Sequence, residues 1–528
     1  MFKRRPSILW LSWPLLLAVL LVSAACSRSE QLLLAENNRD GTAEIFLADL
    51  DADDSEWQLL AEDAERTFIF AGEMAMFVPD TDRILLWYVD GNDVRIEQMQ
   101  IGDEAPTELF EASVDYRMFA SLETDPFTVF VTETRNFDNY RCYVSQDGAK
   151  AERFSRSTFC VMNENGVVLV DYDVDKGTTV TVASLDGEEE TVVLDEVEDV
   201  GSRIRYNAAL TQFAYAEVSD NEAQLFSIEP GADEGAAVGE TFAVIDTFGF
   251  LGDGETLYVV GKLDEADEAF GLFIDAAGDA LVEADDITWL DQSEDGAFAI
   301  FKAESGGDTA VYLYNLAENK VTELVEDETV NLVGYPTEDY FLLKSSNEDE
   351  AGLYSVSHDG TKIIELLNTD EYEILFSYIN KAAEQLLVQL RNADGNDAIY
   401  ITSLNEDDGY FLLDDWDSIT TLTASEENFI FWGREDEADD VVLYSIPWAL
   451  DASAVELDDK ADFGYRTAYF SADGRSLYYT AVDNRIDDFE VRFVPVDGSE
   501  RAARIYRDTI LLDVGWQGEP NLKMVSNR

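Results

Sequence analysis

Three aspartates at alternate positions are the first candidates for metal chemistry. Asp171, Asp173 and Asp175 stand in the run DYDVDKG, where they could offer carboxylate oxygens to one cation. Calcium prefers such oxygen ligands, and an EF-hand loop places glycine sixth and glutamate twelfth. Lys176 and Val182 occupy those positions here, so the run is not an EF-hand. We interpret it first as a hairpin turn and keep calcium as a secondary hypothesis.

Histidine chemistry rests on one residue. His358 is the single histidine of the chain and stands in the run SHDG, which matches the turn at Val496-Asp497-Gly498. A serine–histidine–aspartate triad would have to use it. The sequence contains no G-x-S-x-G motif of the kind that carries a hydrolase nucleophile. Carboxylates are too numerous for any acid pair to be singled out. We therefore interpret His358 as an exposed turn residue and assign no catalytic residue.

The first 26 residues have the layout of a secretory signal. A basic start, KRR, precedes an apolar run over residues 8–22, and small residues then lead to Cys26. The ending LVSAAC resembles a bacterial lipobox, which implies cleavage before Cys26 and a diacylglycerol group on its sulfur. We expect residues 1–25 to be a signal peptide and residues 26–30 an anchor segment. The alternative is a plain signal peptide with an incidental cysteine.

Two further cysteines, Cys142 and Cys160, could form a disulfide. Export places Cys142 and Cys160 in a compartment where a disulfide is chemically allowed. Cys142 lies in the strand-like run 140–145, and Cys160 lies in the next such run, 158–162. We expect a disulfide between them, and two buried thiols are the alternative.

Short apolar or alternating runs must position all these residues. They are rich in Val, Ile, Leu, Phe and Tyr and are separated by turn clusters, a pattern typical of strands. One run per unit recurs at steps of about 40 to 47 residues after a longer first step. A period of 40–50 residues with four short strands is typical of propeller blades. The anchors of this repeat are Leu33, Leu85, Val129, Leu169, Phe213, Leu257, Phe298, Phe341, Leu386, Ile430, Leu477 and Leu522.

Asp-Gly turns separate the strands within a unit. In the unit over 469–506, a turn at Asp473-Gly474 follows the first strand and a turn at Asp497-Gly498 precedes the fourth. Glycine accepts the positive φ that tight hairpins need. The segments RDGTAEIF, DGNDAIY and YFSADGRSL resemble the TolB-type, WD40-like (PD40) propeller repeat. This resemblance extends in weakened form from about residue 31 to the end. It implies a binding scaffold or an accessory domain beside a peptidase, with no single conserved chemistry.

The number of repeats sets the domain prediction. About eleven or twelve four-stranded units exceed the four to eight blades of ordinary rings. We therefore predict an all-β chain of two propellers in tandem, over residues 31–285 and 286–528. Closure of one ring by both ends of the chain is the alternative, because the first unit lacks an innermost strand and the last ends after two strands.

The charge of the chain limits its partners. Thirty-five Lys and Arg residues against 111 Asp and Glu residues give a formal net charge of −76. No basic surface is available to neutralise phosphates, so nucleic acid is excluded as a partner. The membrane is reached only through the N-terminal lipid. Such acidity suits cationic partners, bound cations or a high-salt habitat, and the sequence does not separate these.

These features together predict a non-catalytic binding protein. We expect a lipid-anchored, extracytoplasmic scaffold of the cell envelope that displays a propeller to protein, peptide or glycan ligands, without a cofactor. The alternative is a propeller-fold lyase or glycosidase that acts on polysaccharide with carboxylates, arginine and tyrosine. A tight acid pair with Arg or Tyr would favour that alternative.

Overall fold

The computed structural model describes residues 31–525, apart from short connecting segments of which 50–56, 66–73, 460–467 and 515–521 are the longest. Within these residues every regular element is a β-strand, so the predicted all-β class is confirmed. No helix in this part of the chain is long and apolar enough to cross a membrane. The predicted signal peptide and anchor segment, including Cys26, lie outside the described residues.

Forty-five described strands form eleven sheets, which we call blades A to K in chain order. Blade A contains β1 (Gln31–Asn37), β2 (Ala43–Asp49), β3 (Gln58–Ala64) and β44 (Thr509–Val514). Blade B contains β4 (Ala75–Phe77), β5 (Arg83–Asp90), β6 (Asp93–Gln100) and β7 (Thr107–Ser113). Blade C contains β8 (Arg117–Thr124), β9 (Phe127–Thr134), β10 (Tyr140–Gln146) and β11 (Glu152–Arg153). Blade D contains β12 (Phe159–Asn163), β13 (Gly166–Asp173), β14 (Gly177–Ala183) and β15 (Glu190–Val197).

The middle of the chain forms four further sheets. Blade E contains β16 (Ile204–Tyr206), β17 (Phe213–Ser219), β18 (Glu222–Ile228) and β19 (Ala236–Phe242). Blade F contains β20 (Val244–Phe250), β21 (Leu257–Lys262), β22 (Phe270–Ile274) and β23 (Ala277–Ala284). Blade G contains β24 (Asp286–Gln292), β25 (Phe298–Ser305), β26 (Asp308–Asn315) and β27 (Lys320–Glu326). Blade H contains β28 (Asn331–Gly334), β29 (Tyr340–Ser346), β30 (Ala351–Ser357) and β31 (Ile363–Thr369).

The last three sheets include the only five-stranded one among the described residues. Blade I contains β32 (Tyr372–Asn380), β33 (Gln385–Asn392), β34 (Asp397–Ser403), β35 (Tyr410–Trp416) and β45 (Leu522–Val525). Blade J contains β36 (Ser418–Ala424), β37 (Asn428–Arg434), β38 (Val442–Pro447) and β39 (Val455–Asp458). Blade K contains β40 (Ala468–Phe470), β41 (Ser476–Asp483), β42 (Asp488–Pro495) and β43 (Ala503–Arg507).

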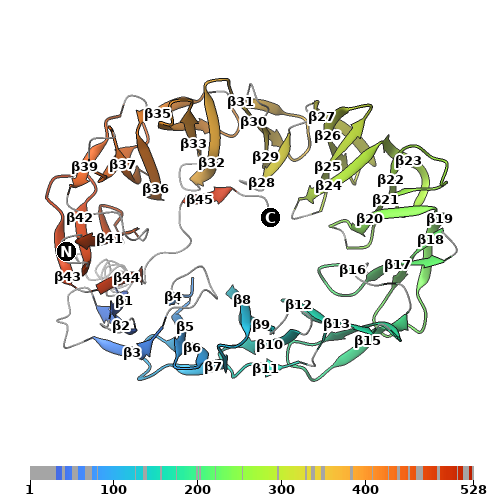
Figure 1. Cartoon of the computed structure of the whole chain (residues 1–528), viewed down its shortest axis with the longest axis horizontal. Helices are drawn as coiled ribbons and strands as arrows, with labels where there is room; N and C mark the ends of the chain where they lie inside the picture. Colours follow the sequence, from blue (N-terminus) through green and yellow to red (C-terminus); the bar gives the residue numbers. More distant parts are fainter. Residues whose placement is uncertain are drawn as a thin grey trace, which may run out of the picture.

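The blades follow one another around one elongated ring, and one end strand of each blade lies on the inner side (Figure 1). We call the innermost strand of each four-stranded unit the inner rim, which consists of β4, β8, β12, β16, β20, β24, β28, β32, β36, β40 and β44. In blade I the added strand β45 lies on the inner side of β32. The strands next to the rim are buried on both faces, as in β5, where five successive residues are buried. The sheets therefore stack face to face around the ring.

Packing between blades closes the ring once. Among the described residues, eleven hydrophobic clusters each join two neighbouring blades. The cluster between blades F and G holds Tyr258 and Phe301, which lie on either side of residue 285. The cluster between blades K and A packs Tyr478 near Leu32 and Leu511. Two tandem rings are therefore not confirmed, because the packing continues through residue 285 and returns to the first blade.

The first strand of the described chain, β1, and its last strand but one, β44, meet in blade A. Strand β44 supplies its inner strand and pairs antiparallel with β1, with Leu34 opposite Leu511. Eleven of the twelve predicted repeat anchors, from Leu33 to Leu477, lie on the strand next to the rim in successive blades. The twelfth, Leu522, begins β45, which is an added strand of blade I and not a blade of its own. The alternative, closure of a ring by segments from both ends of the chain, is thus found in blade A, whereas a single ring of all eleven blades was not predicted.

Side-chain hydrogen bonds explain why Asp-Gly turns recur. The Ser471 hydroxyl donates to Asp473 Oδ1 (2.7 Å) and accepts from the Ser476 backbone N–H (3.0 Å). The hydrogen bond from Ser471 is the main cause that lowers the pKa of Asp473. Gly474 has φ +69°, a conformation that suits glycine. Hydrogen bonds of the same pattern occur at Ser184 and Ser357, so the turn is a repeated local unit.

Buried side chains of one blade also hold the inner strand of the next. In β36 the backbone N–H of Ile419 donates to Asp397 Oδ2 (2.9 Å), and its C=O accepts from Gln389 Nε2 (3.0 Å). Similar bonds join Lys344 Nζ to the Ile374 C=O (2.7 Å) and the Leu511 N–H to Thr480 Oγ1 (2.9 Å). At these residues the inner strand pairs with a neighbour on one side only, so the bonds satisfy backbone groups on its other side.

Removal of one such bond should weaken the ring. We expect Q389A to lower the free energy of unfolding by about 1–3 kcal/mol, because the buried Ile419 carbonyl loses its donor. Denaturation followed by tryptophan fluorescence measures this change. The exposed Gln100 provides the control, since Q100A should change stability by less than about 0.5 kcal/mol. Equal stability of Q389A and the unchanged protein would contradict the role of this bond.

Candidate functional site

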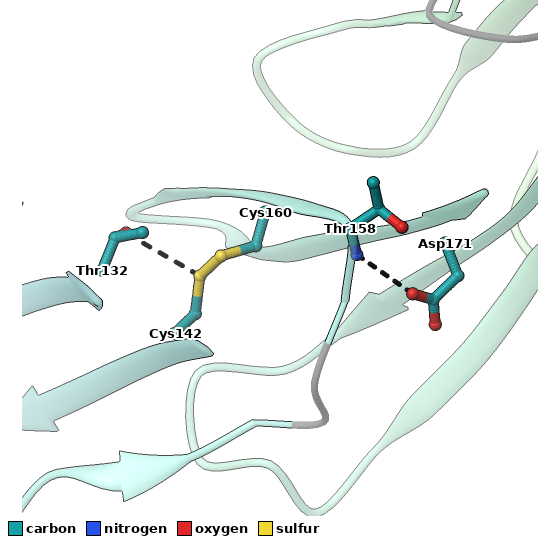
Figure 2. The surroundings of a disulfide bond; sticks show 5 residues. All are labelled: Thr132, Cys142, Thr158, Cys160 and Asp171. Atoms are coloured by element: carbon teal, nitrogen blue, oxygen red, sulfur yellow. Dashed lines mark hydrogen bonds between the residues drawn. A yellow bond between two sulfur atoms is a disulfide. The ribbon is translucent and has the colours of Figure 1, made fainter. Parts of the chain in front are cut away.

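A disulfide joins two neighbouring blades and holds one inner-rim strand, β12. Cys142 on β10 of blade C is bonded to Cys160 on β12 of blade D, with 6.6 Å between their Cα atoms (Figure 2). Both cysteines are buried in the cluster between these blades. Thr132 Oγ1 lies 3.8 Å from Cys142 Sγ. The crosslink closes a short segment of chain, with a sequence separation of 18, and fixes the inner strand of blade D to blade C.

The three candidate calcium ligands take part in strand and turn hydrogen bonds. Asp171 Oδ1 accepts from the backbone N–H of Thr158 at 3.0 Å, beside the disulfide (Figure 2). Asp173 Oδ1 accepts from the N–H of Asp175 at 2.9 Å, in the turn between β13 and β14. Within the described part of the chain, no group of three or more His, Cys, Asp or Glu side chains is placed to hold a metal ion. Calcium binding at these aspartates stays a prediction.

His358 packs against aromatic rings. Its ring centroid lies 6.0 Å from that of Phe341 and 6.5 Å from that of Phe298, and its side chain is half-buried. Its backbone N–H donates to the C=O of Asp339 (2.9 Å). The expected turn is present, but the side chain is half-buried and not exposed as expected, because Phe298 of blade G packs against it.

A buried ion network lies between blades J and K. Arg492 on β42 donates to Asp458 Oδ2 (2.7 Å) on β39 and to Glu490 Oε2 (2.9 Å). Arg504 donates to the other oxygen of Glu490 (2.8 Å), and the Tyr479 hydroxyl donates to Asp458. Both carboxylates are at most 5% exposed. The network therefore joins the outermost strand of one blade to three strands of the next.

The network holds fixed charges. Burial alone would raise the pKa of Glu490, but the hydrogen bonds from Arg504 and Arg492 outweigh it and lower the pKa. Burial raises the pKa of Tyr479, and the charge of Asp458 raises it further. A general acid at neutral pH needs a carboxyl group with a raised pKa. Glu490 stays ionised and Tyr479 stays protonated, so both suit a structural ion network.

Another buried carboxylate lies in blade C. Glu133 is 2% exposed and accepts from Arg141 Nη1 (2.6 Å) and from the Tyr143 hydroxyl (3.0 Å). The Arg141 guanidinium lies 5.2 Å from the centroid of the Tyr116 ring. This arginine is thus held between a carboxylate and an aromatic face, an arrangement that stabilises it.

Exposed aromatic side chains occur on the inner rim. Phe119 on β8 is 55% exposed, Phe159 on β12 is 50% exposed and Phe376 on β32 is 46% exposed. Phe159 also meets Tyr140 edge-on, with 6.0 Å between ring centroids. Single exposed apolar residues are ordinary, but these three lie on one structural feature, the rim. Their flat faces could stack on sugar rings or contact apolar side chains of a peptide.

The sequence pattern does not predict the residues of the two ion networks. Asp458 and Arg492 are 34 residues apart and belong to different blades, so no local pattern joins them. The signal that could have found them is an arginine on a strand otherwise filled by apolar residues, as in the run VRFV. A buried arginine requires carboxylate partners.

No protein-family model and no curated protein matches the chain. It is similar to the crystal structure of a eukaryotic initiation factor, with a TM-score of 0.40 and 10% identity over 94% of this chain and 99% of that chain. It is similar to a putative TolB from Agrobacterium tumefaciens, with a TM-score of 0.24 and 12% identity over 49% of this chain and 90% of that chain. It is also similar to TolB from Acinetobacter baumannii, with a TM-score of 0.21 and 12% identity over 78% of this chain and 83% of that chain.

These similarities are too low to assign a family or a function. The propeller fold that the TolB-type resemblance implied is confirmed by the eleven blades themselves. Membership of that family stays a prediction.

The disulfide should contribute measurable stability. We expect C142S/C160S to lower the free energy of unfolding by about 3 kcal/mol, because the unfolded chain regains the freedom that an 18-residue crosslink removes. Denaturation curves with and without reductant measure it. The variant should be insensitive to reductant, whereas the unchanged protein should lose the same amount when reduced. Two free thiols in the untreated, unfolded protein would contradict the crosslink.

The Glu490 network should make stability depend on pH in a defined direction. At pH 7 we expect E490Q to lower the free energy of unfolding by about 3 kcal/mol, because Arg492 and Arg504 lose their shared carboxylate. A lowered pKa in the folded state contributes stability at higher pH, which is lost as the pH falls through that pKa. The difference between E490Q and the unchanged protein should therefore shrink below about pH 4.5. Denaturation at pH 7 and pH 3.5 measures it.

The exposed Glu500 supplies the control for this comparison. E500Q removes the same charge from blade K and should change stability by less than about 0.5 kcal/mol at either pH. A loss for E490Q that is equal at both pH values would show that the charge of Glu490 is not responsible.

Proposed function

We propose that the protein is a non-catalytic, lipid-anchored binding and scaffold protein on the outer side of a cell membrane, whose inner rim receives protein, peptide or glycan ligands. The observation that carries this proposal is the set of exposed aromatic side chains on the rim, Phe119, Phe159 and Phe376. Aromatic faces of this kind bind sugars and apolar peptide side chains. A ring of many blades brings such groups from distant parts of the chain onto one surface.

Charge supports a cationic or neutral ligand. The formal net charge of −76 raises the local concentration of cationic segments near the ring at low ionic strength. Exposed acids accompany the aromatic residues on the rim, including Glu123 on β8, Asp246 on β20 and Glu373 on β32. The same charge disfavours nucleic acid. The lipid on Cys26 would hold this surface at the membrane without insertion of the ring.

The alternative remains a propeller-fold lyase or glycosidase. The residue types expected for it do meet, since Asp458, Glu490, Arg492 and Tyr479 form one network. In that network the pKa of Glu490 is lowered, the opposite of what a carboxyl general acid needs at neutral pH.

Arrays of cationic peptides and envelope glycans test the proposal with the anchored, full-length protein in detergent. We expect ligands whose binding weakens at least tenfold in F119A/F159A, because the stacking faces are removed from the rim. Peptide binding should also weaken as salt is raised from 50 to 500 mM, because screening reduces the attraction to the acidic ring. Fluorescence polarisation of array hits measures both effects.

The outer strand β35 provides the matched control. Phe411 is 39% exposed there, and F411A should leave ligand binding unchanged. C26S should abolish labelling by radioactive fatty acid and release the protein from membranes, because the acylated sulfur is lost. Hits that bind F119A/F159A and the unchanged protein equally would overturn the role of the rim, and labelled C26S would overturn the anchor.

A further inference from the structure

One inner-rim strand carries a strand from elsewhere in the chain. Strand β45 pairs antiparallel with β32, with Leu522 opposite Asn380 and Val525 opposite Ser377. It lies against the inner side of blade I (Figure 1). The strand that precedes it in the sequence, β44, belongs to blade A, so blades J and K separate the two along the ring. A segment from outside the blade has thus been added to an existing sheet edge.

The edge of β32 differs from those of neighbouring inner strands. Side chains of the preceding blade bond the backbone of Ile419 on β36 and of Leu511 on β44. On β32 Lys344 bonds the C=O of Ile374, which lies near the start of the strand. The last four residues, Ser377–Asn380, are instead paired with the backbone of β45. This half of the edge therefore accepts a peptide strand where its neighbours accept side chains.

The resident strand shows which chemistry the edge accepts. The segment Leu522-Lys523-Met524-Val525 is extended, apolar and singly cationic in a chain of formal net charge −76. Addition of a strand to a sheet edge draws its affinity from main-chain hydrogen bonds, so any extended segment of compatible side chains can take part. The acidic ring attracts cations, so it favours a ligand that carries a positive charge, as Lys523 does in β45.

We propose that the inner edge of β32 over Ser377–Asn380 is a strand-addition site for extended peptides that combine apolar residues with a cation, and that β45 is its intramolecular occupant. This proposal deepens the proposed binding function and rests on it, because it names the ligand class and the position on the rim. The site lies directly beside Phe376, the exposed aromatic residue of the same strand.

The pairing is short enough to exchange. Four residue pairs hold β45, whereas seven hold β1 to β2 in blade A. A tethered segment competes through its effective concentration, which is in the millimolar range for short flexible links. A free peptide must therefore overcome this competitor in the unchanged protein, and weakening of β45 should reveal the site.

Release of β45 in the full-length protein tests the proposal. K523P/M524P removes two adjacent backbone N–H groups, at least one of which faces β32 in antiparallel pairing. The probe is a fluorescein-labelled peptide of residues 519–528, EPNLKMVSNR. We expect it to bind K523P/M524P at least tenfold more tightly than the unchanged protein, as measured by fluorescence anisotropy. Unchanged circular dichroism would show that the ring still folds.

Matched controls separate strand pairing from side-chain chemistry. K523R/M524L keeps both N–H groups and the charge, so it should bind the probe as weakly as the unchanged protein. A probe with proline at both positions should not bind K523P/M524P. Hydrogen exchange supplies a second measurement: amides of Ser377–Asn380 should exchange faster in K523P/M524P and slow again when the probe is added. The proposal would be overturned if the probe bound K523P/M524P and the unchanged protein with equal affinity. It would also be overturned if the probe slowed exchange only of amides outside Ser377–Asn380.

These outcomes are distinguishable from failure of the proposed function. Probe binding at β32 without any array ligand would leave the site intact and remove the wider binding function. Array ligands that depend on Phe119 and Phe159 but bind equally to K523P/M524P and the unchanged protein would support the function and remove the β32 site.

Discussion

Burial of both faces of every blade is the constraint on which this fold depends. The strands next to the inner rim are buried on both sides, as in β5 and β33, each with five successive buried residues. A sheet of this kind must be covered twice, and a row of blades would leave two faces bare at its ends. Closure removes those ends. The pairing of β1 with β44 and the packing of Tyr478 against blade A are therefore as necessary as any single blade core.

Eleven blades in one ring create a second constraint at the rim. Apart from β32, which also pairs with β45, each inner strand has a sheet partner on one side only. An open strand edge invites pairing with other chains. The chain covers parts of these edges with side chains such as Gln389, Asp397 and Thr480. On β32 it uses a backbone strand instead. The rim is thus where structural and binding demands meet, because the same backbone groups can bond the chain itself or a ligand.

The sequence predicts much of the local strand and turn structure but little of how the blades close into a ring. In the unit over 469–506, the patterns predict strands over 469–471, 476–482, 489–495 and 501–506, and each bound lies within two residues of a strand bound in the structure. Alternating patterns and Asp-Gly turns are local signals, so they suffice for this. The count of about eleven units also follows from spacing alone. Whether the units form one ring or two depends on the rotation between neighbouring blades. Side-chain packing between blades sets this rotation, and the sequence of a repeat does not indicate it. Leu522 matched the repeat pattern, yet it begins an added strand.

The candidate site was less predictable for the same reason. Cys142 and Cys160 could be paired because they were the two cysteines left in an exported chain. The contact between Asp458 and Arg492 could not be predicted, because it depends on how blade J packs on blade K. His358 lies in its expected turn, but its burial comes from Phe298 of the preceding blade. Contacts between blades are set by tertiary packing, and the sequence pattern describes each blade alone.

The crosslinks differ in kind around the ring, and their positions suggest how the ring resists opening. Stability in a repeat array is close to a sum over neighbouring units, so a ring opens first at its weakest interface. A disulfide holds blades C and D, and an ion network holds J and K. The C-terminal segment adds a different connection, since β44 lies in blade A and β45 in blade I. It therefore spans the arc that contains the K–A closure. Loss of that closure alone would not separate blade A from blade I while β45 stays paired, so the added strand joins the ends of the arc independently of the interfaces within it.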